Sequence, residues 1–224
     1  LKVGSLLTVA DLAGQSTTEL YNRIVKALYF NDYTWQQEKR IRALRPRSAV
    51  GLEQLLYMCP KCKQEFTIRS KGNHLSCVQC GNAANMDHYG FLAPEKADDV
   101  VFTTPPEWYK WQKNEYRLNV TDGAVYCEPC RIFRITDSNK FVPVGEGRFY
   151  LSREVFRYTG TCEGRNMDYS IDNQRYPNFS NEIRGYFNIE IEGQIYAIQP
   201  HNSPAVFKVT ILKELFSESC MPEA

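Results

Sequence analysis

Two Cys-x-x-Cys pairs separated by a short spacer constrain the fold of this chain more than any other feature. The first pair is Cys59 and Cys62, and the second pair, after a spacer of fourteen residues, is Cys77 and Cys80. Each pair can form a tight turn that offers two sulfurs to the same side of a tetrahedral ion. The spacing therefore predicts a zinc ribbon with these four ligands. The Zn²⁺ would be structural, because four thiolates leave no position open for water or substrate.

Two other interpretations of the four cysteines are weaker. They are four unrelated cysteines or two redox pairs, and the doubled spacing disfavours both. His74 lies between the pairs and has a side chain that can bind zinc, but four thiolates already complete the tetrahedron. We therefore interpret His74 as a surface residue, and we predict short strands at residues 65–68 and 73–76, between the two metal turns.

Cys127 and Cys130 form a third Cys-x-x-Cys motif, for which three interpretations are open. It is half of a second metal site, a redox pair, or an inert pair of thiols at a turn between two strands. A second metal site needs partners, and besides the histidines only Cys162 and Cys220 remain, which are not in paired spacing. The inert interpretation is therefore favoured.

The composition is that of an ordinary globular protein, and it limits the partners that the chain can have. The 224 residues carry a net charge of +1, so there is no global attraction for nucleic acid or membranes. No apolar run reaches the roughly 18 residues of a membrane span, and no secretion signal is visible. Eight cysteines, four of them in metal spacing, fit a reducing cytoplasm better than a disulfide framework. We expect a cytoplasmic protein, located at the inner membrane face if it contacts lipid.

The N-terminal part reads as helical. The chain begins at Leu1 with what looks like the end of a strand, which suggests a fragment of a longer protein. Ser16-Thr-Thr-Glu19 matches a capping box, in which the hydroxyl and the carboxylate each satisfy a free amide at a helix start. We expect the helix to end near Asn31-Asp32, before a second, more polar segment. The apolar residues that recur at helical spacing, and should pack on another element, are Leu20, Ile24, Ala27 and Leu28.

A cluster of basic residues without any acid follows the second segment. Such a cluster can attract the phosphates of nucleic acid or of anionic lipid headgroups. The alternative is a solvated linker surface, which is equally compatible with the pattern. Pro46 makes a continuous helix through the cluster unfavourable. The five basic residues are Lys39, Arg40, Arg42, Arg45 and Arg47.

A second capping box, Thr104-Pro-Pro-Glu107, predicts a helix over residues 108–119. Trp108, Trp111 and Tyr116 lie along this helix among charged residues. An aromatic stripe at this spacing is most often the surface that docks on a neighbouring domain, and binding of a ligand is the alternative.

From residue 123 onward, short alternating runs punctuated by turn residues predict antiparallel sheet. Ser203-Pro204 then predicts the start of a closing helix. The predicted strands cover residues 124–127, 131–136, 141–144, 148–151, 155–158, 167–171, 184–191 and 195–198. The apolar residues of the closing helix are Phe207, Ile211, Leu212, Leu215 and Phe216.

These patterns together predict an α+β fold. A mostly antiparallel sheet of about seven or eight strands, closed by one helix that plugs the end of the bent sheet, is the outline of a pleckstrin-homology-like or GRAM-like domain. The predicted organisation is a helical segment at residues 1–50, the zinc ribbon at 51–95, a connecting aromatic helix at 96–122 and the β-rich domain at 123–224.

The first half of the chain resembles a known family. The segments that carry the resemblance are Gly51-Leu-Glu-Gln-Leu-Leu-Tyr-Met-Cys-Pro-Lys-Cys62, Cys77-Val-Gln-Cys-Gly-Asn82, Met86-Asp-His-Tyr-Gly-Phe-Leu92 and Glu107-Trp-Tyr-Lys-Trp-Gln112. They are similar to the region that follows the catalytic domain in bacterial 1-acyl-glycerol-3-phosphate acyltransferases, chiefly of Firmicutes. Residues 1–36 resemble the last strand and helix of that catalytic domain.

The catalytic motifs of that family are absent from this sequence. In the family, a His-x-x-x-x-Asp motif activates the glycerol-phosphate hydroxyl, and a Pro-Glu-Gly-Thr-Arg-like loop binds the phosphate. Glu163-Gly164-Arg165 echoes the second motif, but it follows the ribbon and lacks the flanking Pro and Thr. The resemblance thus implies a C-terminal accessory part of a membrane-surface enzyme of lipid synthesis, with no catalytic residue in this stretch.

Three functions follow, in order of preference. The first is a noncatalytic module that positions, regulates or docks a glycerolipid acyltransferase, with the upstream acyltransferase domain and an anionic membrane surface as partners. The second is a nucleic-acid-binding zinc-ribbon protein, which the near-neutral charge and the acidic hairpin at Glu190 and Glu192 disfavour. The third is an enzyme that uses other residues, and it predicts acyl transfer by this chain alone.

Overall fold

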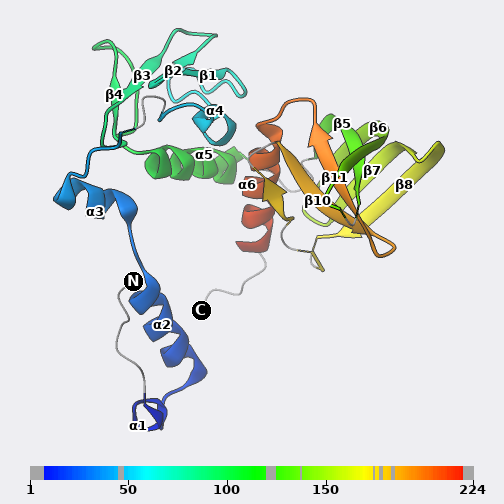
Figure 1. Ribbon diagram of the computed structural model, residues 1–224, viewed down its shortest axis with the longest axis horizontal. Coiled ribbons are helices and arrows are strands. Elements are labelled where there is room, and N and C mark those ends of the chain that lie inside the picture. Colours follow the sequence, from blue (N-terminus) through cyan, green and yellow to red (C-terminus); the bar gives the residue numbers. More distant parts are fainter. Residues whose placement is uncertain are drawn as a thin grey trace. The chain divides into compact units, whose positions relative to one another are not determined.

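The computed structural model describes residues 8–44, 48–119, 125–136, 138–173, 175–176, 179–182 and 185–218. The chain divides into two compact units, Leu1–Ile41 and Arg42–Ala224, which we describe separately. The architecture is α+β with two antiparallel sheets and a C-terminal helix, as predicted from the sequence (Figure 1).

The described residues of the first unit form three helices: α1 (Val9–Leu12), α2 (Thr17–Leu28) and α3 (Asp32–Lys39). The predicted capping box at the start of α2 is confirmed, because Ser16 Oγ accepts from the Glu19 amide at 3.3 Å and Glu19 Oε2 accepts from the Ser16 amide at 2.7 Å. Asn31 caps α3 through its side-chain oxygen. The apolar side of α2 was expected to pack on another element, but no side chain of this helix is buried.

The second unit begins with the cysteine-rich part. A short helix, α4 (Leu52–Leu55), precedes a four-stranded antiparallel sheet in the order β1-β2-β3-β4. The two predicted strands are present but displaced toward the C-terminus, because Phe66 adopts a left-handed backbone that interrupts the first one. The second hairpin was not predicted. The strands are β1 (Ile68–Lys71), β2 (His74–Cys77), β3 (Ala83–Met86) and β4 (Leu92–Pro94).

Helix α5 (Pro105–Asn119) follows this sheet and begins with the second predicted capping box. Glu107 Oε2 accepts from the Thr104 amide at 3.0 Å, and Thr104 Oγ1 accepts from the Glu107 amide at 3.4 Å. Trp108 is buried in the core of the ribbon, and its Nε1 donates to the Met58 carbonyl oxygen at 2.9 Å. The aromatic side of α5 therefore docks on its neighbours, as the first interpretation of the stripe predicted.

The second sheet has seven strands in the order β8-β7-β6-β5-β11-β10-β9. It consists of two antiparallel meanders joined where β11 pairs with β5. Its strands are β5 (Tyr126–Ile135), β6 (Phe141–Leu151), β7 (Val155–Cys162), β8 (Arg165–Asp172), β9 (Asn181–Glu182), β10 (Tyr186–Ile191) and β11 (Gln194–Pro200).

Two pairs of predicted strands are each one continuous strand. The segments 124–127 and 131–136 were separated by Pro129, but Pro129 lies just beyond the last pair of β5 with β11, where a missing N–H breaks no ladder bond. The glycines between segments 141–144 and 148–151 lie where the backbones of β6 and β7 come close to each other. A Cβ on Gly147 would lie 2.2 Å from the carbonyl oxygen of Thr159, so only glycine allows the sheet to curl here.

The closing helix α6 (Ala205–Glu218) contacts the curled sheet at β9 and β11, and it also contacts α4 and α5. Figure 1 shows it between α5 and the sheet. Its buried residues are Ala205, Val206, Val209, Ile211, Leu212, Lys213, Leu215 and Phe216. Helix α6 contacts both the part that contains the ribbon and the seven-stranded sheet, and the two sheets belong to one compact unit. The domain boundaries predicted within this unit remain predictions.

Candidate metal centre

The structure brings the four predicted ligands together. The sulfurs of Cys59, Cys62, Cys77 and Cys80 all lie within 4.8 Å of one another. Two of the distances are 3.6 Å, between Cys59 and Cys80, and 3.7 Å, between Cys62 and Cys77. A tetrahedron with Zn–S bonds of about 2.3 Å has edges of about 3.8 Å, so the donor set has the size and the chemistry of a four-thiolate metal site.

The two ligand loops share one backbone conformation. In the first loop the amide of Lys63 donates to the carbonyl oxygen of Cys59 at 2.9 Å, and in the second the amide of Gly81 donates to that of Cys77 at 3.0 Å. Lys63 and Gly81 both adopt left-handed backbone angles, with φ of 58° and 73°. The amides of Cys59 and Cys77 donate to carbonyl oxygens five residues later in the chain, those of Gln64 and Asn82 respectively. Each Cys-x-x-Cys sequence is thus closed by the same turn.

The thiols differ in environment. Cys59 and Cys77 are buried, Cys62 is half-buried and Cys80 is exposed. Burial raises the pKa of the Cys59 and Cys62 thiols. Burial also raises the pKa of Cys77, but hydrogen bonds from Thr67 and from the backbone amides of the loop outweigh it and lower this pKa to about 6. A thiolate is therefore favoured at Cys77 near neutral pH, which suits a metal ligand.

The third Cys-x-x-Cys motif has a different geometry. Cys127 and Cys130 lie inside β5, so the predicted location of the pair at a turn between two strands is wrong. Side chains three positions apart in a strand point to opposite sides of the sheet. Cys130 is buried in the core, whereas Cys127 contacts Arg148 at 3.7 Å. Among the residues that the structure describes, the first quartet is the one group of three or more potential metal ligands.

The other predicted residues are not among the four potential ligands that the described part of the chain groups together. His74 is a surface residue whose ring pairs with Glu95 at 2.8 Å. Lys39 and Arg40 end the first unit and Arg42 begins the second, and all three are exposed. Arg45, Arg47 and Cys220 lie outside the described residues.

A joint between the ribbon and the sheet domain was missed by the sequence reasoning. Glu65, which follows the first ligand loop, accepts hydrogen bonds from Tyr116 of α5 and from Lys208 of α6, the latter at 2.6 Å. The ammonium group of Lys208 lies 4.3 Å from the ring centroid of Tyr126 and also faces the ring of Phe66. Tyr116 belongs to the aromatic stripe seen in the sequence, but no local pattern marks Glu65 or Lys208, because these two residues lie far apart in the sequence.

The first ligand loop is also attached to α5 through its backbone. Gln112 is fully buried, and its side chain accepts from the amide of Met58 and donates to the carbonyl oxygen of Leu55, both at 2.9 Å. Lys63 pairs with Glu115 at 2.9 Å. The residues on both sides of Cys59 are thus held by α5.

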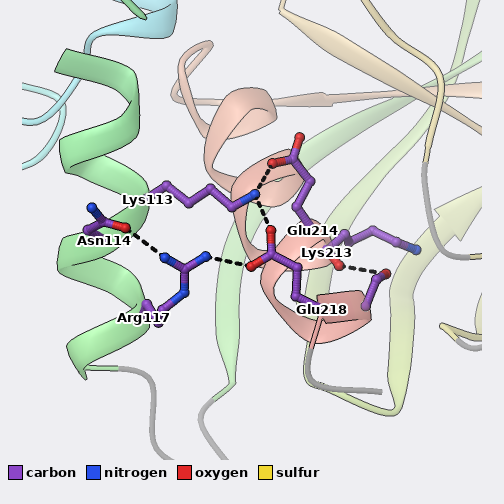
Figure 2. Close-up of polar contacts among 7 residues, drawn as sticks. Lys113, Asn114, Arg117, Lys213, Glu214 and Glu218 are labelled. Carbon is purple, nitrogen blue, oxygen red and sulfur yellow. Dashed lines mark hydrogen bonds and ion pairs between the residues drawn. The ribbon is translucent and has the colours of Figure 1, made fainter. Parts of the chain in front are cut away.

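Helices α5 and α6 are joined by a group of ion pairs. Figure 2 shows Lys113 of α5 extending between Glu214 and Glu218 of α6, each at 2.7 Å. Arg117 contacts Glu218 at 2.5 Å and Asn114 at 2.7 Å. The acidic partners are partly exposed, so each pair contributes less than about 1 kcal/mol. The group completes a continuous path of contacts from the first ligand loop to α6.

None of the helices in the described part of the chain is both long enough and apolar enough to cross a bilayer. Comparisons with protein-family models and with curated proteins give no match.

Proposed function

We propose that this chain is a noncatalytic accessory region of a glycerolipid acyltransferase, in which a zinc-bound ribbon is the connector that holds the sheet domain. The observation that carries the connector role is the attachment of the first ligand loop to both α5 and α6 through Glu65. The acyltransferase context is supported by the resemblance of residues 51–62 and the three later segments. In this proposal the basic residues from Lys39 to Arg47 contact anionic lipid headgroups.

Zinc is the proposed metal, since a closed set of four thiolates in a tetrahedral arrangement suits it best. Iron also accepts four sulfurs in this geometry, so the metal has to be measured. Elemental analysis of the purified protein should give one zinc per chain, and Cys77→Ser should lose it. Iron in place of zinc, or no metal in the unaltered protein, contradicts this assignment.

The connector role predicts an order of events when the metal is removed. A chelator should free the first ligand loop and then α5, so that limited proteolysis cuts residues 59–119 before it cuts the sheet domain. Glu65→Gln should make the same region more sensitive to the protease with the metal still bound. Glu95→Gln is the matched control, because Glu95 pairs with His74 at the surface of the ribbon. Equal protease sensitivity of the two variants would show that Glu65 does not hold the ribbon to α5 and α6.

The noncatalytic assignment is tested by an acyl-transfer assay with lysophosphatidate and either acyl-CoA or acyl carrier protein. The chain alone should transfer no acyl group, and transfer would overturn the proposal. The natural gene should encode a His-x-x-x-x-Asp motif upstream of Leu1, and a gene without it would argue against the acyltransferase context. Binding of DNA or RNA with a steep salt dependence would instead support the zinc-ribbon alternative.

A further inference from the structure

The ammonium group of Lys208, on α6, is surrounded by three aromatic rings and a carboxylate. The ring centroids lie 4.3 Å from its Nζ for Tyr126, 5.4 Å for Tyr116 and 5.7 Å for Phe66. All three distances are within the roughly 6 Å over which the face of a ring attracts a cation. Glu65 Oε2 accepts a hydrogen bond from the same Nζ at 2.6 Å. We call the surrounding residues the ammonium cage: Glu65, Phe66, Tyr116 and Tyr126.

The carboxylate and two of the rings are held by contacts that do not involve Lys208. The hydroxyl of Tyr116 donates to Glu65 Oε1, which is the oxygen that Lys208 does not use. The hydroxyl of Tyr126 donates to Glu128 Oε2 at 3.2 Å. Groups that are fixed by other contacts keep their arrangement when a ligand leaves, and such preorganisation favours binding.

The third ring, that of Phe66, is placed by an unfavourable backbone conformation. Its φ of 59° lies in the left-handed region, which bulky residues rarely adopt. The Phe66 amide donates to the carbonyl oxygen of Tyr57 at 2.7 Å, and the two rings stack with centroids 5.3 Å apart. Backbone strain of this kind persists where the surrounding contacts enforce it, and it is found most often at ligand sites. The position of this ring is therefore also set without Lys208.

The charges around the cage favour a cation inside it. The side chain of Glu65 is 25% exposed, that of Lys208 is 13% exposed, and Glu128 behind the ring of Tyr126 is buried. A partly buried carboxylate that loses its counter-ion is costly, so an empty cage would attract another cation. Among the described residues, the other side-chain partners of the two carboxylates are neutral; they are Tyr116, Tyr126 and Asn202.

We infer that the ammonium cage is a binding site for one primary ammonium group and that Lys208 occupies it as an intramolecular ligand. A primary ammonium group suits the site because it can donate to Glu65 and still face the rings. The cage should therefore bind a small alkylammonium ion once the side chain of Lys208 is removed. This inference rests on the connector part of the proposed function, for which it names the chemistry of the joint.

The first test empties the cage and offers it a free ligand. Lys208→Ala removes three methylene groups and the amine, which together correspond to propylammonium. Urea unfolding in about 100 mM propylammonium chloride, compared with the same concentration of sodium chloride, should raise the folding equilibrium constant of Lys208→Ala about tenfold, as for a Kd of about 10 mM. The unaltered protein should change by less than about twofold, because its cage is filled.

Lys113→Ala is the matched control for this rescue. Lys113 is also a lysine with partly exposed carboxylate partners, Glu214 and Glu218, each at 2.7 Å (Figure 2). It should not respond to propylammonium, since two carboxylates without a cage do not bind a monovalent cation tightly at this concentration. Propanol, which has the same carbon chain without the charge, should not rescue Lys208→Ala.

A double-mutant cycle tests the cage with the space of the lysine stem filled, so it also decides the matter if Lys208→Ala does not fold. Lys208→Met and Tyr126→Leu should be coupled by about three- to thirtyfold in the unfolding equilibrium constant, as expected for a cation on a ring. Lys208→Met and Tyr126→Phe should be coupled by less than about twofold, because phenylalanine keeps the ring.

Three outcomes would overturn the inference. They are no response of a folded Lys208→Ala protein to propylammonium, an equal response of Lys113→Ala or to propanol, and equal coupling of Lys208→Met to the two Tyr126 variants. The last result would reduce the joint to an ordinary ion pair with Glu65. None of these measurements depends on zinc content, acyl transfer or proteolysis of the ribbon, so a failure here is distinguishable from a failure of the proposed function.

Discussion

Helices α2 and α6 differ both in sequence pattern and in environment, because α2 has one apolar and one charged side whereas α6 is apolar on most of its sides. Both repeat leucine, isoleucine and valine at helical spacing, yet no residue of α2 is buried and eight residues of α6 are. The sheet covers one side of α6, and α4 and α5 cover another. A helix that is apolar on most of its sides, as α6 is, is buried by several neighbours, whereas the one apolar side of α2 belongs to a helix without a buried residue.

Loss of the metal should have the largest effect, because it removes the support on one side of α6. Cys59→Ser is expected to lose the proposed zinc and the fold of the ribbon, since structural zinc contributes on the order of 10 kcal/mol to folding. Zinc content and hydrogen exchange of α6 measure this. Cys127→Ser is the control, because Cys127 lies on β5 outside the quartet and should keep both properties. Unchanged protection of α6 in Cys59→Ser would show that the sheet alone supports it.

The same substitution in the two helices should give very different costs. Leu212 of α6 is 5% exposed and Leu28 of α2 is 77% exposed. Leu212→Ala should lower the free energy of unfolding by about 2 to 5 kcal/mol, because it leaves a cavity in the core. Leu28→Ala should change it by less than about 0.5 kcal/mol. Denaturant unfolding of both variants checks this, and equal costs would mean that the side chain of Leu28 is covered in solution.

Lys213 makes the burial of α6 sensitive to pH. Its ammonium group donates to Asn173 at 3.0 Å and lies 3.6 Å from the ring centroid of Phe179, and burial lowers its pKa to about 8. The unfolded chain, with a lysine pKa of about 10.4, binds more protons between these values, so stability should rise with pH there by up to about 1.4 kcal/mol per unit. Below pH 8 both states are protonated and the destabilisation is fully present. Lys213→Met should lack this rise, and an identical pH profile would place the ammonium in water.

A small effect is also expected at the ion pairs between α5 and α6. Hydrogen bonds from Lys113 and then Arg117 lower the pKa of Glu218, which is partly exposed. Its contribution is therefore present above its usual pKa of 4.5 and is lost as the pH falls through the lower folded value. Glu218→Gln should cost less than about 1 kcal/mol at neutral pH and less still at high salt. A larger loss, measured by thermal unfolding, would make these pairs a principal support of α6.

The cysteine quartet and the helix starts could be predicted because their patterns are local. Two residues that bind one ion, or one residue that caps a helix three positions away, leave a fixed spacing in the sequence. The strands were predicted less well, because β5 and β6 were each predicted as two separate segments. The gaps contain Pro129 and Gly147, and each strand continues through them because the neighbouring strand ends beside Pro129 and comes close to Gly147.

The joint at Glu65 could be predicted only through Tyr116, which belongs to the aromatic stripe of α5. It assembles side chains from the ribbon, α5, β5 and α6, and each of them alone has the spacing of an ordinary surface or helix residue. For the same reason the exposure of α2 was unexpected: its periodicity predicted packing, and periodicity carries no information about the partner.

The two ligand turns, although equal in shape, are unequal in backbone strain. Gly81 adopts the left-handed conformation without steric cost, and open space surrounds the position of its missing side chain. Lys63 adopts the same conformation with a side chain, at a cost of about 1 kcal/mol, and this side chain contacts Glu115. The turn that fastens the metal centre to α5 is therefore the strained one. The strain and the attachment come from one residue. A substitution of Lys63 would therefore change the backbone strain of this turn and its attachment to α5 at the same time.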